Sequence, residues 1–229
     1  MLEILKQEVY EANIALVKYG LVRLTWGNAS AIDRTSGHIV IKPSGVEYDD
    51  MNPEDMVIVD LDGKVVCGNY KPSSDTATHI ELYRQFGGIG AVVHTHSTWA
   101  TIMSQIGKPL PAFGTTHADY FAGNIPCTRD MTETEISCNY ELETGKVIVE
   151  AFEGINPLDI PAVLVKNHGP FTWGQGANKA VENAFVLEEV AKMAYYTQNA
   201  LTNTPEMPKA LLHKHFYRKH GDGAYYGQK

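Results

Sequence analysis

Two histidines separated by one residue close an apolar run in the middle of the chain. His94 and His96 follow the segment "GIGAVV". On a β-strand, residues at this spacing point to the same face, so both imidazoles can reach one metal ion. Short motifs of this kind also arise by chance. On the pair alone, a strand end with hydrogen-bonded histidines is the more frequent explanation.

A third histidine makes a metal site the better interpretation. His168 follows the apolar run "PAVLV", and we expect it to stand before a Gly-Pro turn. Strand ends and the loops beyond them are where rigid scaffolds place functional groups. Three imidazoles would leave open positions on an ion for water or substrate. The alternative is a histidine that is satisfied within its own turn.

The segment "KPSSDTATH" can supply a carboxylate and an anion site. Asp75 lies in the first turn of an expected helix, where it is a fourth metal ligand, an acid/base group, or only an acidic residue favoured by the helix dipole. Ser73 and Ser74 bring hydroxyls to the helix start, whose free N–H groups suit a phosphate. The alternative is an ordinary helix cap.

A second segment, "KPSG", has the composition of a phosphate loop. Lys42 provides a cation, Ser44 a hydroxyl, and Gly45 a backbone that permits close approach. An ordinary turn is the alternative for this segment alone. Beside a metal, the two segments indicate a small phosphorylated substrate rich in oxygen.

Three further groups have weaker signals. Asp119, in "GTTHADYFAGNIP", is a possible acid or base, and His117 in the same segment is a less well-placed ligand. We interpret His79 as a packing or capping residue, since its helix face also carries large apolar residues. The basic run 213–220 is expected to be a helix face near an anion site, with RNA binding as a remote alternative.

The elements that must position these residues form one α/β (α+β-like) domain over residues 1–229. Apolar spacings of three and four predict helices over 1–20, 76–86, 178–200 and 209–220. Short apolar runs predict strands within 38–45, 56–66, 90–96, 145–152 and 161–169. Asp62-Gly63 is a hairpin signal. We therefore predict a single domain with a central, largely antiparallel β-sheet flanked by helices.

Bulk composition narrows the class of function. The net charge of −8 over 229 residues disfavours nonspecific binding to nucleic acid or to an anionic membrane. No apolar stretch reaches the roughly 20 residues of a membrane span, and charged residues interrupt any signal-peptide core at the start of the chain. Three cysteines without a CxxC pair suit free thiols, so we expect a cytoplasmic protein.

Seven segments together resemble a known family, and the resemblance spans the chain. The sequence is similar to the L-ribulose-5-phosphate 4-epimerases of the class II sugar-phosphate aldolase superfamily. The similarity lies in "TWGNAS", "IKPSGVEYDDM", "KPSSDTATH", "VVHTHS", "GTTHADYF", "NHGPFTWG" and "HGDGAYYGQ". The histidines are shared across the superfamily, whereas "PSSDT", "TTHADYF" and "YYGQ" are more specific to the epimerases.

The resemblance implies roles for particular residues. It implies one divalent metal ion per subunit, expected to be Zn2+, held by His94, His96 and His168 with Asp75. It implies that Asp119 and Tyr226 transfer protons, Tyr226 from a neighbouring subunit, and that the tail 221–229 helps complete the site. It implies a C4-type homotetramer with sites at subunit interfaces. The implied substrate and phosphate contacts are Gly27, Asn28, Lys42, Ser44, Gly45, Ser73, Ser74 and His215.

The implied reaction interconverts L-ribulose 5-phosphate and D-xylulose 5-phosphate at C4. The C4 proton is not alpha to the carbonyl, so we expect retro-aldol cleavage of the C3–C4 bond. The expected intermediates are a metal-bound enediolate and glycolaldehyde phosphate, and re-addition to the other aldehyde face gives the epimer. Two proton-handling groups are then needed, with a raised carboxyl pKa or a lowered phenol pKa.

Two other functions fit parts of the pattern. A class II aldolase would release its aldehyde fragment, but the aldolases typically carry Glu where this chain has Asp75. An adducin-type binding module would share the fold without its catalysis, and retention of the three histidines and Asp75 argues against that. The pathway served, L-arabinose or L-ascorbate degradation, is not encoded in the residues.

Overall fold

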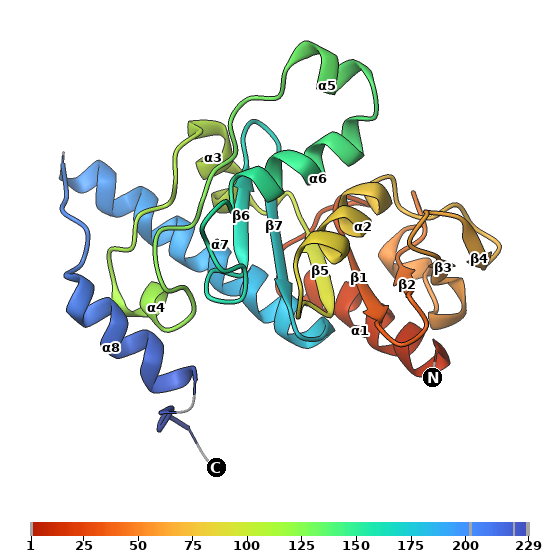
Figure 1. Cartoon of the computed structure of the whole chain (residues 1–229), viewed down its shortest axis with the longest axis horizontal. Coiled ribbons are helices and arrows are strands. Elements are labelled where there is room, and N and C mark those ends of the chain that lie inside the picture. Colours follow the sequence, from red (N-terminus) through yellow and green to blue (C-terminus); the bar gives the residue numbers. More distant parts are fainter. Residues whose placement is uncertain (1, 202, 222, 228–229) are drawn as a thin grey trace.

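A seven-stranded antiparallel sheet runs through the molecule and separates two layers of helices (Figure 1). The computed structural model describes residues 2–201, 203–221 and 223–227. The strand order is β4-β3-β2-β1-β5-β7-β6, and every neighbouring pair is antiparallel. The strands are β1 (Asn28–Asp33), β2 (His38–Ile41), β3 (Val57–Val59), β4 (Val65–Cys67), β5 (Ala91–His94), β6 (Ala162–Val165) and β7 (Gly169–Gly174). The predicted antiparallel sheet flanked by helices is confirmed.

Eight α-helices and two 3-10 turns connect these strands within the described residues. The helices are α1 (Leu2–Lys18), α2 (Thr76–Gln85), α3 (Thr98–Ile106), α4 (Thr115–Ala118), α5 (Glu133–Ser137), α6 (Tyr140–Glu150), α7 (Ala177–Ala200) and α8 (Lys209–Lys219). The 3-10 turns are η1 (Tyr48–Asp50) and η2 (Pro53–Asp55). In this part of the chain, none of the helices combines the length and apolar character needed to cross a bilayer.

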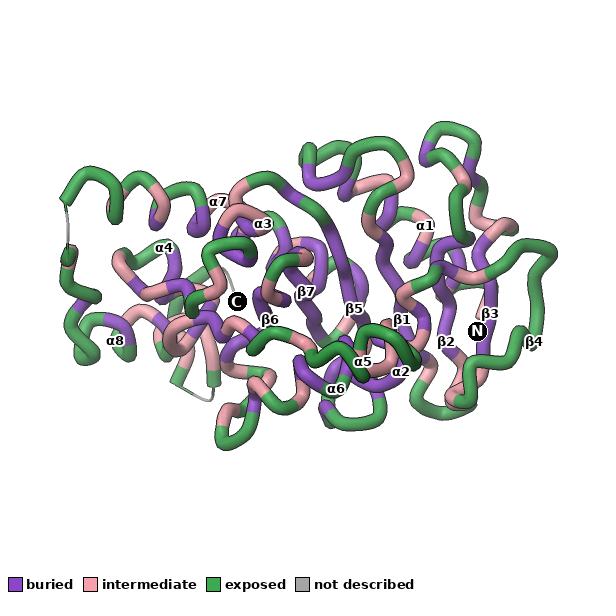
Figure 2. Tube along the Cα trace, turned by 90° about the horizontal axis from the view of Figure 1, so that it is seen from above, coloured by how far each residue is buried: buried purple, intermediate pink, exposed green. Residues whose placement is uncertain are grey.

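The alternation of side chains along β1 and β5 gives the sheet two different faces. Ala29, Ala31 and Val93 pack on the face covered by α1 and the start of α7. Ile32 and Val92 belong to the core of the opposite face, where α2 and α6 lie in front of the sheet in Figure 1. Because His94 is two residues from Val92, it shares the α2 face. Strands β1, β2, β3, β5, β6 and β7 are almost entirely buried, whereas β4 is exposed (Figure 2).

Most predicted elements are present with shifted ends. The helices predicted over 1–20, 76–86, 178–200 and 209–220 correspond to α1, α2, α7 and α8. The hairpin predicted at Asp62-Gly63 joins β3 to β4, with Gly63 at φ +79°. Strand β1, which has few large apolar residues, strand β7 and the helices α3, α4 and α5 are not predicted from the sequence.

Two local predictions are wrong. Residues 145–152 were expected to form a strand, but most of them belong to helix α6. Thr144, Val147 and Ile148 form the buried side of α6, so packing overrides the β preference of the valines and isoleucine. The second error concerns Gly169 and Pro170, which begin strand β7 and do not form a turn.

Candidate metal centre and active site

The centre of the sheet places three site residues in register. His94 on β5 lies opposite Asn28 on β1 and opposite Phe171 on β7. The His94 ring stacks on the Phe171 ring with centroids 4.2 Å apart and planes 19° apart. His94 is 2% exposed, so its imidazole is buried and packs against the apolar ring of Phe171.

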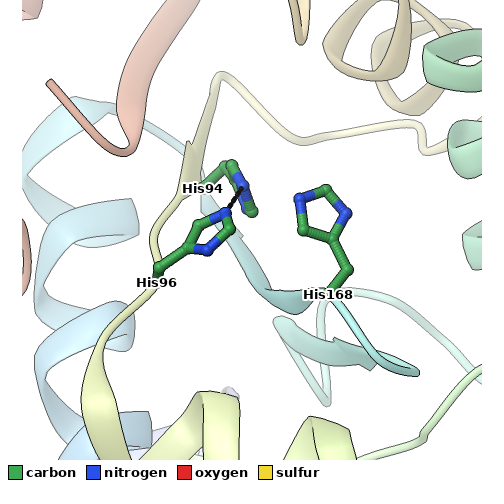
Figure 3. Close-up of side chains that lie close together, drawn as sticks. All are labelled: His94, His96 and His168. Carbon is green, nitrogen blue, oxygen red and sulfur yellow. Dashed lines mark hydrogen bonds between the residues drawn. The ribbon is translucent and has the colours of Figure 1, made fainter.

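The structure brings the three predicted histidines together (Figure 3). One ring nitrogen from each of His94, His96 and His168 lies within 4.8 Å of the other two. The ring centroids are 4.9 Å apart for His94 and His96, 4.7 Å for His94 and His168, and 5.1 Å for His96 and His168. His96 follows the end of β5, and His168 comes from the turn between β6 and β7. These distances allow the three nitrogens to bind one ion.

The protonation states of the three histidines and the hydrogen bond of His94 are also those expected of metal ligands. His94 Nδ1 donates to the carbonyl of Pro170 at 3.0 Å, which leaves Nε2 with its lone pair. That Nε2 lies 3.1 Å from Nε2 of His96. Burial lowers the pKa of His94 well below its usual range, and His168 and His96 lower it further. Burial also lowers the pKa values of His96 and His168, against an opposing effect of Asp75. Neutral imidazoles are the form that binds metals.

Asp75 is directed toward the site by Asn28. It occupies the N-cap position of α2, but its side chain makes no capping hydrogen bond. Its Oδ2 accepts a 2.6 Å hydrogen bond from Nδ2 of Asn28 instead. The carboxylate is outside the group of nitrogens that lie within 4.8 Å of one another, yet it lines the same cavity. The helix-dipole interpretation of Asp75 requires no capping hydrogen bond and still applies, and its role as a ligand stays a prediction.

One cavity of about 410 Å3 joins the histidines to the predicted phosphate segments. Asn28 Nδ2 also donates to Ser73 Oγ at 3.0 Å, which ties β1 to the loop before α2. Gly27 has φ +87°, and a Cβ there would lie 2.8 Å from the carbonyl oxygen of His94. The cavity is lined by seven of the eight residues implied as substrate and phosphate contacts, all except His215: Gly27, Asn28, Lys42, Ser44, Gly45, Ser73 and Ser74.

Lys42 is buried at the wall of this cavity. Its Nζ donates to the carbonyls of Val46 at 2.6 Å and Pro43 at 3.3 Å, and lies 4.7 Å from the ring centroid of Tyr48. Burial lowers the pKa of Lys42 to about 8, with Glu47 opposing the shift. The ammonium group is thus held by backbone carbonyls at the wall of the cavity.

Five lining residues are not among the site residues predicted from the sequence: Thr25, Trp26, Pro43, Tyr140 and Glu141. Trp26 is 52% exposed and its ring centroid lies 6.3 Å from that of His96. Tyr140 OH lies 3.3 Å from His168 Nδ1. Trp26 could have been predicted as a site residue because it directly precedes Gly27, an implied substrate contact. Tyr140 had no such signal, because the strand prediction for 145–152 obscured the helix that carries it.

The predicted proton-transfer residues form a separate group, here called the Asp119 cluster. Asp119 Oδ1 is 2.9 Å from His215 Nδ1, and Oδ2 accepts from Arg218 at 2.8 Å and lies 3.2 Å from Lys219 Nζ. The Tyr226 ring lies under Arg218 and Lys219 at 4.8 and 4.7 Å. Among the described residues of one chain, the cluster (Asp119, His215, Arg218, Lys219 and Tyr226) does not line the histidine cavity.

The electrostatics of the Asp119 cluster favour an ionised carboxylate. Burial alone would raise the pKa of Asp119, but hydrogen bonds from Arg218, His215 and Lys219 outweigh it and lower the pKa. A raised carboxyl pKa was one of the two alternatives expected from the resemblance, and within one chain the pKa of Asp119 shifts in the opposite direction. The lowered pKa keeps Asp119 ionised near neutral pH and makes its carboxylate a weaker base than an unperturbed aspartate. Arg218 and Lys219 were expected on a helix face near an anion site, and their contact with Asp119 spans about 100 residues.

The chain matches the class II aldolase and adducin N-terminal domain over residues 7–195. This protein belongs to that family. The class II aldolase domain therefore contains the sheet, the histidines and Asp119, while α8 and the tail lie beyond the matched region.

Solved structures support the same assignment of this class II aldolase domain. An L-fuculose 1-phosphate aldolase is 27% identical, with a TM-score of 0.77 over 92% of this chain and 94% of that one. YgbL from Klebsiella pneumoniae, a putative aldolase/epimerase/decarboxylase, is 22% identical, with a TM-score of 0.73 over 92% and 96%. An L-fuculose 1-phosphate aldolase from Glaciozyma antarctica PI12 is 19% identical, with a TM-score of 0.79 over 97% and 84%. The last two similarities establish the fold alone.

Proposed function

We propose that this protein is a metal-dependent L-ribulose-5-phosphate 4-epimerase. The observation that carries the proposal is the single cavity in which the three histidines face Asp75 and the phosphate-type segments. Such a cavity suits a small sugar phosphate whose oxygens reach a metal while its phosphate is held apart. The family membership supports the same class of chemistry.

The residues that would hold the metal are His94, His96 and His168, with Asp75 beside them. A divalent ion bound there supplies Lewis-acid stabilisation for negative charge on substrate oxygens. Three imidazoles and one carboxylate suit Zn2+, which is our proposed ion. The buried, neutral imidazoles and the hydrogen bond to Pro170 are the features of this chain that fit it.

The substrate phosphate is proposed to lie at the other side of the cavity. Ser44, Ser73 and Ser74 supply hydroxyls there, and Gly45 has φ +68° with nothing near its missing side chain. Lys42 adds a positive charge at the wall. Anchoring the phosphate lets the aldehyde fragment turn about its own bond while it stays bound. That turn exposes the second face for re-addition and inverts C4.

Proton transfer is assigned to Asp119 and Tyr226. An ionised Asp119 can take the proton of the C4 hydroxyl as the C3–C4 bond breaks and glycolaldehyde phosphate forms. Tyr226 is proposed to handle the proton on the opposite face, and His215 to orient Asp119 through their 2.9 Å contact. The Arg218 guanidinium and Lys219 Nζ lie 4.8 and 4.7 Å from the centroid of the Tyr226 ring, so two cations border this proposed proton-transfer group.

The site is proposed to be completed between subunits of a homotetramer. Figure 1 shows α4, which Asp119 directly follows, and α8, which carries His215, Arg218 and Lys219, at one end of the elongated molecule. Since Asp119 and Tyr226 share Arg218 and Lys219 within one chain, we assign both groups to the same neighbouring subunit. The tail 221–229 is predicted to help complete this site, and its residues 222, 228 and 229 lie outside the described residues.

A sugar-phosphate aldolase is the second candidate. The 27% identity to an L-fuculose 1-phosphate aldolase favours it, whereas the shorter carboxylate of Asp75 and the Asp119 cluster favour the epimerase. Product analysis separates the two. Incubation with L-ribulose 5-phosphate should yield D-xylulose 5-phosphate without accumulated aldehyde, and stoichiometric release of glycolaldehyde phosphate would instead establish an aldolase.

A further inference from the structure

Of the three histidines at the candidate metal centre, His168 is the one whose side chain is not positioned by a strand of the sheet. His94 ends strand β5 and His96 follows it closely, so the sheet fixes both. His168 lies in the turn between β6 and β7, next to Asn167 at φ +62°. A turn by itself leaves the direction of the His168 ring undetermined, so other contacts must set it.

The backbone of this turn is held by the segment before α5. The backbone N–H of Lys166 donates to Thr128 Oγ1 at 3.0 Å. Asp130 accepts from Nζ of Lys166 and, at 3.1 Å, from Nδ2 of Asn167. These contacts fix the residues on the N-terminal side of His168 but do not touch its ring.

The ring itself is contacted by Tyr140 at the start of α6. Tyr140 OH lies 3.3 Å from His168 Nδ1, and the two ring centroids are 6.1 Å apart. A contact at Nδ1 leaves Nε2 of His168 to face the other two histidines. This is the arrangement by which a group in contact with a ligating imidazole sets its tautomer and orientation.

Helix α6 is locked in place on α2, the helix that begins beside Asp75. Thr78 Oγ1 donates to the carbonyl of Glu141 at 2.6 Å. Gly145 lies so close to α2 that an added Cβ would be 2.7 Å from the Cβ of Glu81. The missing side chain at Gly145 therefore permits the close approach that sets Tyr140 over His168.

We propose that Tyr140 is a positioning residue that orients His168 as a metal ligand by accepting a hydrogen bond from its Nδ1–H. The inference rests on the metal site proposed above. Tyr140 acts through His168, and its own oxygen is not a ligand. Removal of the hydroxyl should weaken the metal site without removing any donor atom.

The test is Tyr140→Phe, measured as zinc affinity by competition with a chromophoric chelator. We expect binding about 10- to 100-fold weaker than in the wild type, the usual effect of losing such a contact. The Co2+-substituted variant should also show a changed visible spectrum, which a purely structural role would not produce. Tyr196→Phe is the matched control, since Tyr196 is exposed on α7, and it should bind zinc as the wild type does.

A second variant tests the anchor and guards against a folding defect. Thr78→Val keeps the phenol but removes the α6 anchor, so it should weaken zinc binding in the same direction. The double variant should be no weaker than Tyr140→Phe alone, because both changes act through one contact. If Tyr140→Phe has the zinc affinity and Co2+ spectrum of the wild type, the positioning role of Tyr140 is overturned, while the proposed metal site is unaffected. A wild-type protein that binds no zinc would overturn the proposed metal site itself.

Discussion

Asn28 and Asp75 are joined by a 2.6 Å hydrogen bond from Nδ2 to Oδ2, which links strand β1 to the start of α2. Asn28 also lies opposite His94 in the sheet register. The bond therefore sets the direction of the carboxylate relative to the strand that carries the first histidine. Without this bond, Asp75 is free to turn toward the open N–H groups of its own helix.

Replacement of Asn28 by Ala should release Asp75 and weaken the metal site. We expect zinc affinity to fall about 10- to 100-fold, as for other contacts that orient ligands. The control is Asn178→Ala, since Asn178 is exposed at the start of α7. Competition with a chromophoric chelator gives both affinities. Equal affinities for the two variants would contradict an orienting role for Asn28.

Subunit mixing tests whether the Asp119 cluster and the histidine cavity meet between chains. Asp119→Asn alone should lower turnover by about 100- to 10,000-fold through loss of the base. His96→Asn alone should be inactive for lack of metal. Co-expression of the two variants should restore about a quarter of wild-type activity if each site takes its halves from adjacent subunits of a ring. Persistent inactivity of separately tagged, copurified mixed oligomers would contradict the shared site.

Buried histidines predict a loss of stability in acid. Burial lowers the pKa of His117 to about 4, against the effects of its hydrogen bond to Gly123 and of Glu206. The unfolded chain binds a proton at this residue near pH 6.5. Stability from the neutral imidazole is therefore complete above pH 6.5 and decreases as the pH falls toward 4, by up to about 1.4 kcal/mol per pH unit.

The variant His117→Gln measures that contribution. Urea unfolding at several pH values between 7 and 4.5 should show a shallower loss of stability in the variant than in the wild type. The amide of the introduced glutamine can still donate to the Gly123 carbonyl, so the change mainly removes the titration. Identical slopes for the two proteins would show that His117 does not titrate as its burial implies.

Gly20 and Gly27 both have left-handed backbone conformations but differ in the space around the missing side chain. Substituting each by alanine therefore separates the cost of backbone strain from the cost of steric contact. Gly20 has φ +71° and open space at its missing Cβ, whereas a Cβ at Gly27 would lie 2.8 Å from the His94 carbonyl oxygen and 2.9 Å from Val22 Cγ1. We expect Gly20→Ala to cost about 1 kcal/mol of unfolding free energy. Gly27→Ala should cost about 1–3 kcal/mol more. Equal costs in urea unfolding would mean that the loop at the site moves without penalty.

The sequence predicts the parts of the site that depend on local periodicity. The two-residue period of a strand places His94 and Val92 on one face, and the glycines of the loops mark where the backbone turns. The anion segments and Asp75 were identifiable because each lies beside a predicted element. The observed cavity contains all of them.

Contacts between distant segments were not predictable in this way. Tyr140 reaches His168 only because Gly145 lets α6 pack closely on α2, and the apolar run Val147–Val149 looks like a strand in the sequence. Asp119 meets Arg218 through the docking of α8 on α4, which no short-range pattern encodes. Propensity therefore failed where tertiary packing determined the structure.

The most direct test of the central claim is a coupled assay of L-ribulose 5-phosphate conversion to D-xylulose 5-phosphate, with and without a chelator. The proposed function predicts epimer formation by the metal-loaded protein, loss of activity on chelation, and recovery on adding Zn2+. His94→Asn, measured beside an Asn178→Ala control, should behave as the chelated protein does. Undiminished conversion by metal-free protein, or no conversion by the zinc-loaded wild type, would contradict the account.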